Sequence, residues 1–189
     1  MGKTMVSNYL HTVHHLPILD ADLYARQAVQ PGSQVLAEVV RRYGATILLP
    51  TGELDRARLG DLIFNSDPER QWLEQQIHPY VRDCMERDLK QLALTGHPTA
   101  VLVIPLLFEA RMTDLVTEIW VVRSPETQQV ERLQQRDRLN LAQIRARISS
   151  QMPIEKKIAQ ATVVLDNSST PEILFAQVDR ALGQERRDE

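Results

Sequence analysis

Apolar side chains recur every three or four positions over much of this chain, which is the period of an amphipathic helix. The pattern predicts helices over residues 5–13, 22–30, 33–43, 55–64, 68–95, 140–151 and 171–182. A further helix should begin at Ser124-Pro125-Glu126, where a capping serine precedes a proline and an acid. Pro79 lies inside the longest helix, so we expect a kink beside His78.

Short apolar segments separate the helices and predict strands at 16–19, 100–108, 118–122 and 162–165. The run from Ala100 to Phe108 is apolar on both faces, as is typical of a strand inside a parallel sheet. Residues 109–115 are expected to form a loop with a helical turn. Because strands alternate with helices, the pattern predicts an α/β fold with a mainly parallel sheet.

Composition narrows the class of protein. The chain has 189 residues, of which 43% are hydrophobic and 25% are charged, as in an ordinary globular domain. The net charge of −3 favours a small anionic ligand at a local site over a nucleic acid or a membrane surface. A single cysteine, and an N-terminus without the pattern of a secretory signal, predict a cytoplasmic protein.

Gly2-Lys3-Thr4 matches the end of the phosphate-binding pattern G-x-x-x-x-G-K-[ST] and stands at the start of a predicted helix. In that motif, backbone N–H groups and the positive end of the helix dipole bind phosphates. Lys3 would reach the β- and γ-phosphates of ATP, and the Thr4 hydroxyl would coordinate magnesium. Three residues alone are weak evidence, since they also occur by chance at a disordered terminus. The helix, strand and acidic residues that follow support the motif.

Residues 1–189 do not contain the strand, first glycine and loop that open this motif. Two explanations stay open: a start codon assigned downstream of the true one, which we favour, or a natural remnant that has lost activity. In both cases we expect impaired ATP binding by residues 1–189, and two neighbouring strands without a partner.

Two carboxylates, Asp20 and Asp22, follow a predicted strand at the sheet edge where open α/β folds bind ligands. A carboxylate there can orient a hydroxyl acceptor and take its proton during phosphoryl transfer. The alternative is that Asp22 only caps the following helix, and both roles can coexist.

The segments described above are together similar to those of the dephospho-coenzyme A kinases, over essentially the whole chain. The matching residues are 2–7, 19–22, 25–26, 31–32, 43–44, 52–56, 59, 63–64, 77–79, 103–109, 132, 136–137, 147–148, 151–153 and 166–167. The Asp-Ala-Asp segment, the His78-Pro79 step and the Pro-Leu-Leu-Phe-Glu segment are the specific matches. Met5 departs from the family, which has a small hydroxyl residue there.

This resemblance implies a three-layer P-loop NTPase fold, with the first strand absent, in a single domain over residues 1–189. An acceptor-binding helical region is expected at about 22–96 and a lid at about 124–153. The resemblance further implies ATP as co-substrate, Mg²⁺, and dephospho-coenzyme A as the small-molecule substrate. We expect a monomer that binds neither nucleic acid nor membrane.

Several residues take roles from the resemblance. Asp22 matches the proposed catalytic base, and Lys3 and Arg136 are expected to act on the transferred phosphate. The nucleotide-binding set is Gly2, Lys3, Thr4, Arg132, Arg136 and Asn167, with Asn167 bordering the adenine. The substrate-binding set is Asp22, Arg26, His78 and Glu109, and Thr4 is the metal ligand.

Some of these residues have structural alternatives. Arg132 and Arg136 lie four apart on one helix face and can clamp a phosphate. They can equally form a solvated basic face balanced by Glu131 and Asp137. His78 is either a contact to the acceptor or a buried, hydrogen-bonded histidine. Glu109 closes an apolar strand and is predicted to contact substrate or magnesium.

The predicted function is therefore ATP-dependent phosphorylation of the ribose 3′-hydroxyl of dephospho-coenzyme A, the last step of coenzyme A biosynthesis. One alternative is a kinase for another small acceptor, such as a nucleoside monophosphate or a sugar. Another is a truncated, inactive protein that binds coenzyme A derivatives or a partner.

Overall fold

The computed structural model describes residues 2–137, 140–149 and 151–188. These residues divide into two compact units. The first unit joins Met1–Ile18 to Thr99–Glu189, and the second is Leu19–Pro98. A division into compact units does not say whether each unit folds by itself. The prediction of a single domain over 1–189 therefore stays a prediction.

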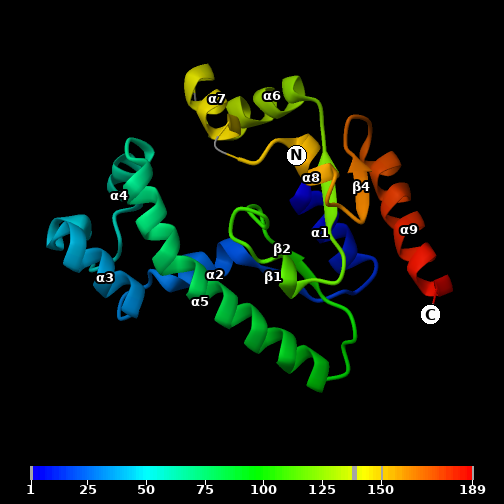
Figure 1. The fold of residues 1–189 in the computed structure, drawn as a ribbon, viewed down its shortest axis with the longest axis horizontal. Coiled ribbons are helices and arrows are strands. Elements are labelled where there is room, and N and C mark those ends of the chain that lie inside the picture. The colour runs from blue at the N-terminus through cyan, green and yellow to red at the C-terminus, as the bar shows by residue number, and fades with distance from the viewer. Residues whose placement is uncertain (1, 138–139, 150, 189) are drawn as a thin grey trace. The chain divides into compact units, whose positions relative to one another are not determined.

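The first unit contains strands with helices before and after them (Figure 1). Its elements are α1 (Lys3–Thr12), β2 (Val101–Val103), a 3-10 turn η2 (Thr113–Leu115), β3 (Trp120–Arg123), α6 (Glu126–Asp137), α7 (Leu141–Ser149), α8 (Ile154–Ile158), β4 (Val163–Asp166) and α9 (Pro171–Asp188). Strand β1 (Ile18–Asp20) begins at the end of this unit and continues into the second.

The strands of the described residues form two pairs. Strands β3 and β4 run parallel, with Trp120 opposite Val163 and Arg123 opposite Asp166. The other pair is β1 with β2, and the Val101 N–H donates to the Pro17 carbonyl at 2.8 Å, just before β1. Figure 1 shows β3 and β4 side by side, with α9 next to β4. The parallel pairing fits the predicted α/β class.

A small apolar core holds the first unit together. Val6 and Leu10 lie four residues apart on α1, so both face the same side of that helix. The buried cluster comprises Val6, Leu10, Val122, Leu165, Leu174 and Val178. Burying one such side chain contributes about 1.5–3 kcal/mol. The cluster therefore fixes α1 against β3, β4 and α9.

The second unit is helical. Its elements are α2 (Ala21–Ala28), α3 (Gln34–Tyr43), η1 (Ala45–Ile47), α4 (Arg56–Phe64) and α5 (Asp67–Leu94). Their buried cluster is Ala28, Val29, Val35, Leu36, Val39, Ile47, Leu54, Leu59 and Leu73. Helix α5 continues through Pro79 as one element, and helices α2, α3 and α4 all contact it. The predicted helical region about 22–96 falls within this unit.

One predicted strand is much shorter than expected. Of the run 100–108, only Val101–Val103 forms a strand, and the residues from Pro105 onward fold into turns. Pro105 has no backbone N–H, and the chain turns back with Ala110 N–H donating to the Leu106 carbonyl at 2.8 Å. The residues of this run are half-buried rather than covered on both faces. The apolar pattern comes from half-buried turn residues as well as from the strand. Periodicity alone does not distinguish such residues from a fully buried strand.

Candidate active site

Helix α1 begins at the phosphate-binding sequence. Gly2 is its N-cap residue, with a φ of 101°, and its carbonyl accepts the N–H of Met5 at 3.0 Å and of Val6 at 3.2 Å. Lys3 and Thr4 are the first helical residues, and the first turn of a helix directs its backbone N–H groups outward along the helix axis. The Thr4 side chain is exposed. This helix end therefore offers donors and a positive dipole to an anion.

Asn167 lies directly against Gly2. It follows β4, is only 2% exposed, and its backbone N–H donates to the Arg123 carbonyl at 2.8 Å. A β-carbon added at Gly2 would come within 3.0 Å of Asn167 Cγ and closer still to its Nδ2. The structure thus brings two predicted nucleotide-binding residues, 165 positions apart in number, into contact.

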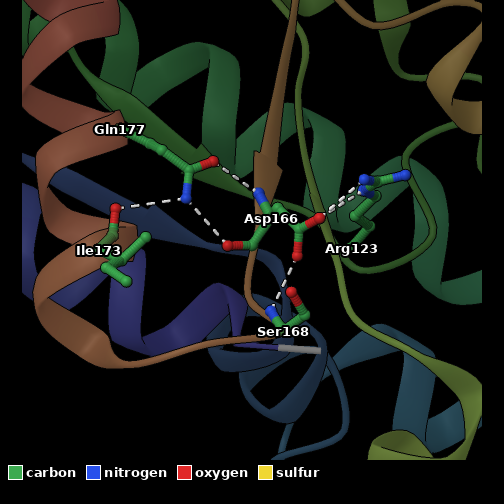
Figure 2. A network of polar contacts seen from close by, with 5 residues as sticks. All are labelled: Arg123, Asp166, Ser168, Ile173 and Gln177. Atoms are coloured by element: carbon green, nitrogen blue, oxygen red, sulfur yellow. Dashed lines mark hydrogen bonds and ion pairs between the residues drawn. The ribbon is translucent and has the colours of Figure 1, made fainter.

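A polar network holds the chain around Asn167 (Figure 2). The Arg123 guanidinium donates to one carboxylate oxygen of Asp166, with Nη2 at 2.7 Å, and the Ser168 N–H donates to the other at 2.9 Å. Gln177 on α9 bonds both backbone groups of Asp166, accepting from its N–H at 2.9 Å and donating to its carbonyl at 3.0 Å. Hydrogen bonds from Ser168, and then from Arg123, lower the pKa of Asp166. Asn167 is therefore presented by a rigid turn.

Arg132 on α6 connects to the same turn through one residue. Its Nη2 donates to Gln128 Oε1 at 3.3 Å, and Gln128 Nε2 donates to the Ser168 carbonyl at 3.0 Å. The Arg132 side chain is exposed, and its described hydrogen bond goes to Gln128 rather than to Glu131. Arg136 belongs to α6 by its backbone, but its side chain lies outside the described residues, as does that of Arg147.

Asp20 and Asp22 have separate roles at the start of α2. Asp20 is the N-cap residue, and its Oδ1 accepts the Asp22 N–H at 2.9 Å. The alternative that Asp22 caps this helix is therefore wrong, because the N-cap residue is Asp20, two positions earlier. The Asp22 side chain is exposed, and its carboxylate has no hydrogen bond to any other described residue. It remains available to a ligand.

Two other predicted acceptor contacts, Arg26 and His78, lie in the same unit as Asp22. The Tyr24 hydroxyl donates to Asp88 Oδ2 at 2.6 Å and joins α2 to α5, which carries His78. That bond lowers the pKa of Asp88. His78 is half-buried and has no hydrogen bond within the described part of the chain, so the buried, hydrogen-bonded alternative is wrong. Arg26 is exposed at the end of α2, where its carbonyl accepts from Arg56 Nη2 at 3.4 Å.

Glu109 has protein partners in the first unit. Its Oε1 accepts the Met152 N–H at 2.8 Å and the Lys157 Nζ at 2.9 Å. Its Oε2 is buried and has no hydrogen-bond partner among the described residues. Burial alone would raise the pKa of Glu109, but the hydrogen bonds from Met152 and Lys157 lower it overall. Lys157 also lines a cavity of about 60 Å³ together with Lys3, space for a few water molecules.

Sequence reasoning missed the residues that support this site. Arg123, Gln177 and Lys157 carry no motif, and each acquires its role from a partner brought in by the fold. Ser124, expected to cap α6, is buried, and within the part of the chain that the structure describes its hydroxyl has no hydrogen-bond partner. The cap prediction is wrong because the Ser124 side chain is covered; its carbonyl instead accepts Gln129 Nε2 at 2.9 Å.

Parallel strands, and a glycine-lysine-threonine sequence opening a helix beside the end of β4, define an α/β kinase of the P-loop class. The particular family follows from comparison with known proteins. The family model for dephospho-CoA kinase matches residues 1–172, so the chain belongs to the dephospho-CoA kinase family. It is accordingly an ATP-dependent kinase of the last step of coenzyme A biosynthesis, and the predicted family, fold class and reaction are confirmed.

Individual relatives agree with the family model. A curated dephospho-CoA kinase of Trichormus variabilis is 56% identical over 184 residues, which cover 97% of this chain and 92% of the relative. One from Synechocystis is 53% identical and covers 95% and 89% of the two chains. A Thermus thermophilus crystal structure matches with a TM-score of 0.79 at 31% identity, covering 97% of this chain and 91% of the other. The dephospho-CoA kinase of Campylobacter jejuni matches the fold with a TM-score of 0.70 at 23% identity, covering 100% and 94%.

Within the described ranges, no helix has the length and apolarity required to cross a bilayer.

Proposed function

We propose that the chain binds the phosphates of ATP at the start of α1 and activates the 3′-hydroxyl of dephospho-CoA with Asp22. The observation that carries this proposal is Gly2-Lys3-Thr4 at a helix start, in a chain whose acidic residue Asp22 is exposed and unpaired within the described residues. Lys3 would bind the β- and γ-phosphates, where its charge offsets the charge that develops during transfer.

The proposed phosphoryl transfer needs one group that accepts the proton of the acceptor hydroxyl. The acceptor oxygen forms a bond to the γ-phosphorus while the bond from that phosphorus to the β,γ-bridging oxygen breaks, and ADP leaves. The Asp22 carboxylate takes the hydroxyl proton. Asp20 supports this role, because it caps α2 and leaves the Asp22 carboxylate unused by the helix. Arg26 and His78 are the proposed further contacts to dephospho-CoA.

Arg132 and Arg136 are proposed to bind the transferred phosphate from the lid, about 124–153. The four-residue spacing on α6 puts both on one face of the helix. The connection from Arg132 through Gln128 to Ser168 supports a shared site with Asn167, which we propose borders the adenine.

Magnesium is proposed as the metal, with Thr4 as its protein ligand. Mg²⁺ is usually held by one or two protein oxygens together with phosphates and water. The exposed Thr4 hydroxyl in the first turn of α1 fits this donor set. When bound, the metal would neutralise phosphate charge. The protein itself is proposed to be a cytoplasmic monomer without affinity for nucleic acid or membrane.

A coupled assay separates this proposal from its alternatives. Purified protein is incubated with ATP, Mg²⁺ and one acceptor from a panel containing dephospho-CoA, AMP, adenosine and a sugar. We expect one ADP per coenzyme A, and at least about a 100-fold preference in kcat/KM for dephospho-CoA, since a hydrogen-bonding site rejects mismatched acceptors strongly. Turnover only on another acceptor would overturn the assignment of substrate.

A second measurement addresses the nucleotide site. Calorimetric titration with ATP and with dephospho-CoA is performed on residues 1–189 and on the product extended by any in-frame upstream codons. Acceptor binding without ATP binding in both forms would favour the inactive, coenzyme A-binding alternative. ATP binding that requires Lys3 would support the proposed kinase site.

A further inference from the structure

We propose that Glu109 is a positioning residue that holds the C-terminal end of the lid, rather than a group that contacts substrate. This inference rests on the proposed function for the lid, about 124–153. In this proposal the Glu109–Lys157 ion pair fixes the position at which the segment bearing Arg132 and Arg136 ends.

Glu109 stands on a fixed part of the chain. The turns that follow β2 are closed by the Ala110 N–H donating to the Leu106 carbonyl at 2.8 Å and the Met112 N–H donating to the Leu107 carbonyl at 3.0 Å. Met112 is 2% exposed, so its side chain anchors this turn in the core. The backbone that carries the Glu109 carboxylate is therefore held in place by this turn.

The partners of Glu109 lie at the end of the lid and just beyond it. The Met152 N–H is 43 residues further along the chain and donates to Oε1 at 2.8 Å. Lys157 Nζ reaches the same oxygen at 2.9 Å. Between them, the Pro153 carbonyl accepts the Lys156 and Lys157 N–H groups at 3.1 and 3.2 Å, so Met152 and Lys157 are joined by a short helix, α8.

The ion pair joins a buried lysine to a half-buried glutamate. The Lys157 side chain is 9% exposed and that of Glu109 is 24% exposed, and α8 packs against β3. A buried cation without its partner is strongly unfavourable, whereas a neutral pair of similar shape is tolerated. The buried, unpartnered Oε2 is inaccessible to a substrate without rearrangement.

The lid is therefore held at both ends. At its start it continues directly from β3, and Gln129 Nε2 donates to the Ser124 carbonyl at 2.9 Å. At its end it is held by Glu109. Loosening the second attachment would displace the arginines of α6, and a displacement of about 1 Å can reduce a rate by roughly 100-fold.

The test uses E109Q, K157M and the double variant E109Q/K157M, with E155Q as the matched control. Glu155 lies on α8 and is exposed, so its neutralisation changes charge nearby without touching the pair. The readouts are kcat, KM for both substrates, and hydrogen exchange of the Met152 amide in the ligand-free protein.

We expect each single variant to lower kcat by about tenfold or more, to leave KM for dephospho-CoA within about twofold, and to speed exchange at Met152 at least about tenfold. The double variant should recover kcat to within about threefold of the parent, since the glutamine oxygen still accepts from Met152 and no buried charge is left unpaired. E155Q should match the parent. If a single variant fails to fold while the double variant folds and is active, the coupling is equally supported.

An E109Q variant with a KM for dephospho-CoA raised more than about tenfold and unchanged Met152 exchange would identify a substrate contact and overturn the proposal. A double variant no better than the worse single variant would overturn it as well. Failure of the proposed function would show separately, as a parent protein that forms no coenzyme A, and the exchange of Met152 would still decide whether Glu109 holds the lid.

Discussion

Gly2 and Asn167 are in direct contact, and the contact leaves no room for a β-carbon on Gly2. Gly2 also has a φ of 101°, which residues with a side chain rarely adopt. Two independent constraints, the positive φ of Gly2 and the neighbouring Asn167 side chain, therefore favour glycine at the start of α1. Helix α1 is thereby tied to the turn that carries Asn167.

The G2A variant should accordingly lose nucleotide binding. We expect at least about a tenfold fall in kcat/KM for ATP, because a shift at the start of α1 would move the N–H groups that are proposed to bind phosphate. Steady-state kinetics and calorimetry measure the effect. G60A is the control, since a β-carbon at Gly60 meets nothing within 4 Å and lies in helix α4. Equal ATP affinity in G2A and the parent would contradict the requirement for glycine.

Substitution of Asp20 should reduce stability, whereas substitution of Asp22 should reduce turnover. D22N is expected to lower kcat by about 100-fold, the scale of a lost general base, with little change in Tm. D20A is expected to lower the free energy of unfolding by about 1 kcal/mol, since it removes the cap on Asp22 N–H. Thermal unfolding and turnover are measured on both variants. If D22N destabilises the protein as much as D20A, the division between cap and base is wrong.

Removing the Tyr24 hydroxyl should weaken the second unit. The Y24F variant loses the 2.6 Å hydrogen bond to Asp88, and we expect a loss of about 1 kcal/mol in the free energy of unfolding. The same bond lowers the pKa of Asp88, so NMR titration should find this pKa higher in Y24F. Urea unfolding gives the stability. An unchanged Asp88 pKa in Y24F would show that the bond is not formed in solution.

Acid should weaken the junction of α3 and α5 in a defined pH range. Arg42 donates to the Glu69 carboxylate from Nε at 2.7 Å and from Nη2 at 2.8 Å, and the Tyr43 hydroxyl donates at 2.6 Å. Hydrogen bonds from Arg42, and then from Tyr43, lower the pKa of Glu69 from 4.5 to about 2. Because the folded-state pKa is depressed, the stabilisation is complete above pH 4.5 and is lost as the pH falls toward 2.

The R42M variant tests this pH dependence. Without the guanidinium the Glu69 pKa should rise, so the midpoint of acid unfolding, followed by circular dichroism, should move to higher pH. R41M is the control, because Arg41 is 78% exposed on the same helix and exposed ion pairs contribute little. An identical acid midpoint in R42M and the parent would refute the role of this pair.

Most of the helices and the family were predictable from the sequence, because their signals are local. The expected helices at 33–43, 55–64 and 68–95 correspond to α3, α4 and α5, since apolar periodicity and capping residues act over a few positions. The strand predicted at 100–108 is confirmed only for Val101–Val103, because an apolar run does not say where a buried strand ends and half-buried turns begin. The predicted site residues and their roles stay predictions.

The sequence by itself determined which functional groups are candidates for a site. They are a glycine-lysine-threonine helix start, an acidic pair after a strand, and an arginine pair on one helix. Only the tertiary structure decided which candidate residues already contact other residues of the protein. Glu109 binds Met152 and Lys157, and Gly2 contacts Asn167. These partners are so far apart in the sequence that no local pattern encodes the contacts. The physical reason is that a side chain's charge state and partners depend on burial, and burial is a property of the folded chain.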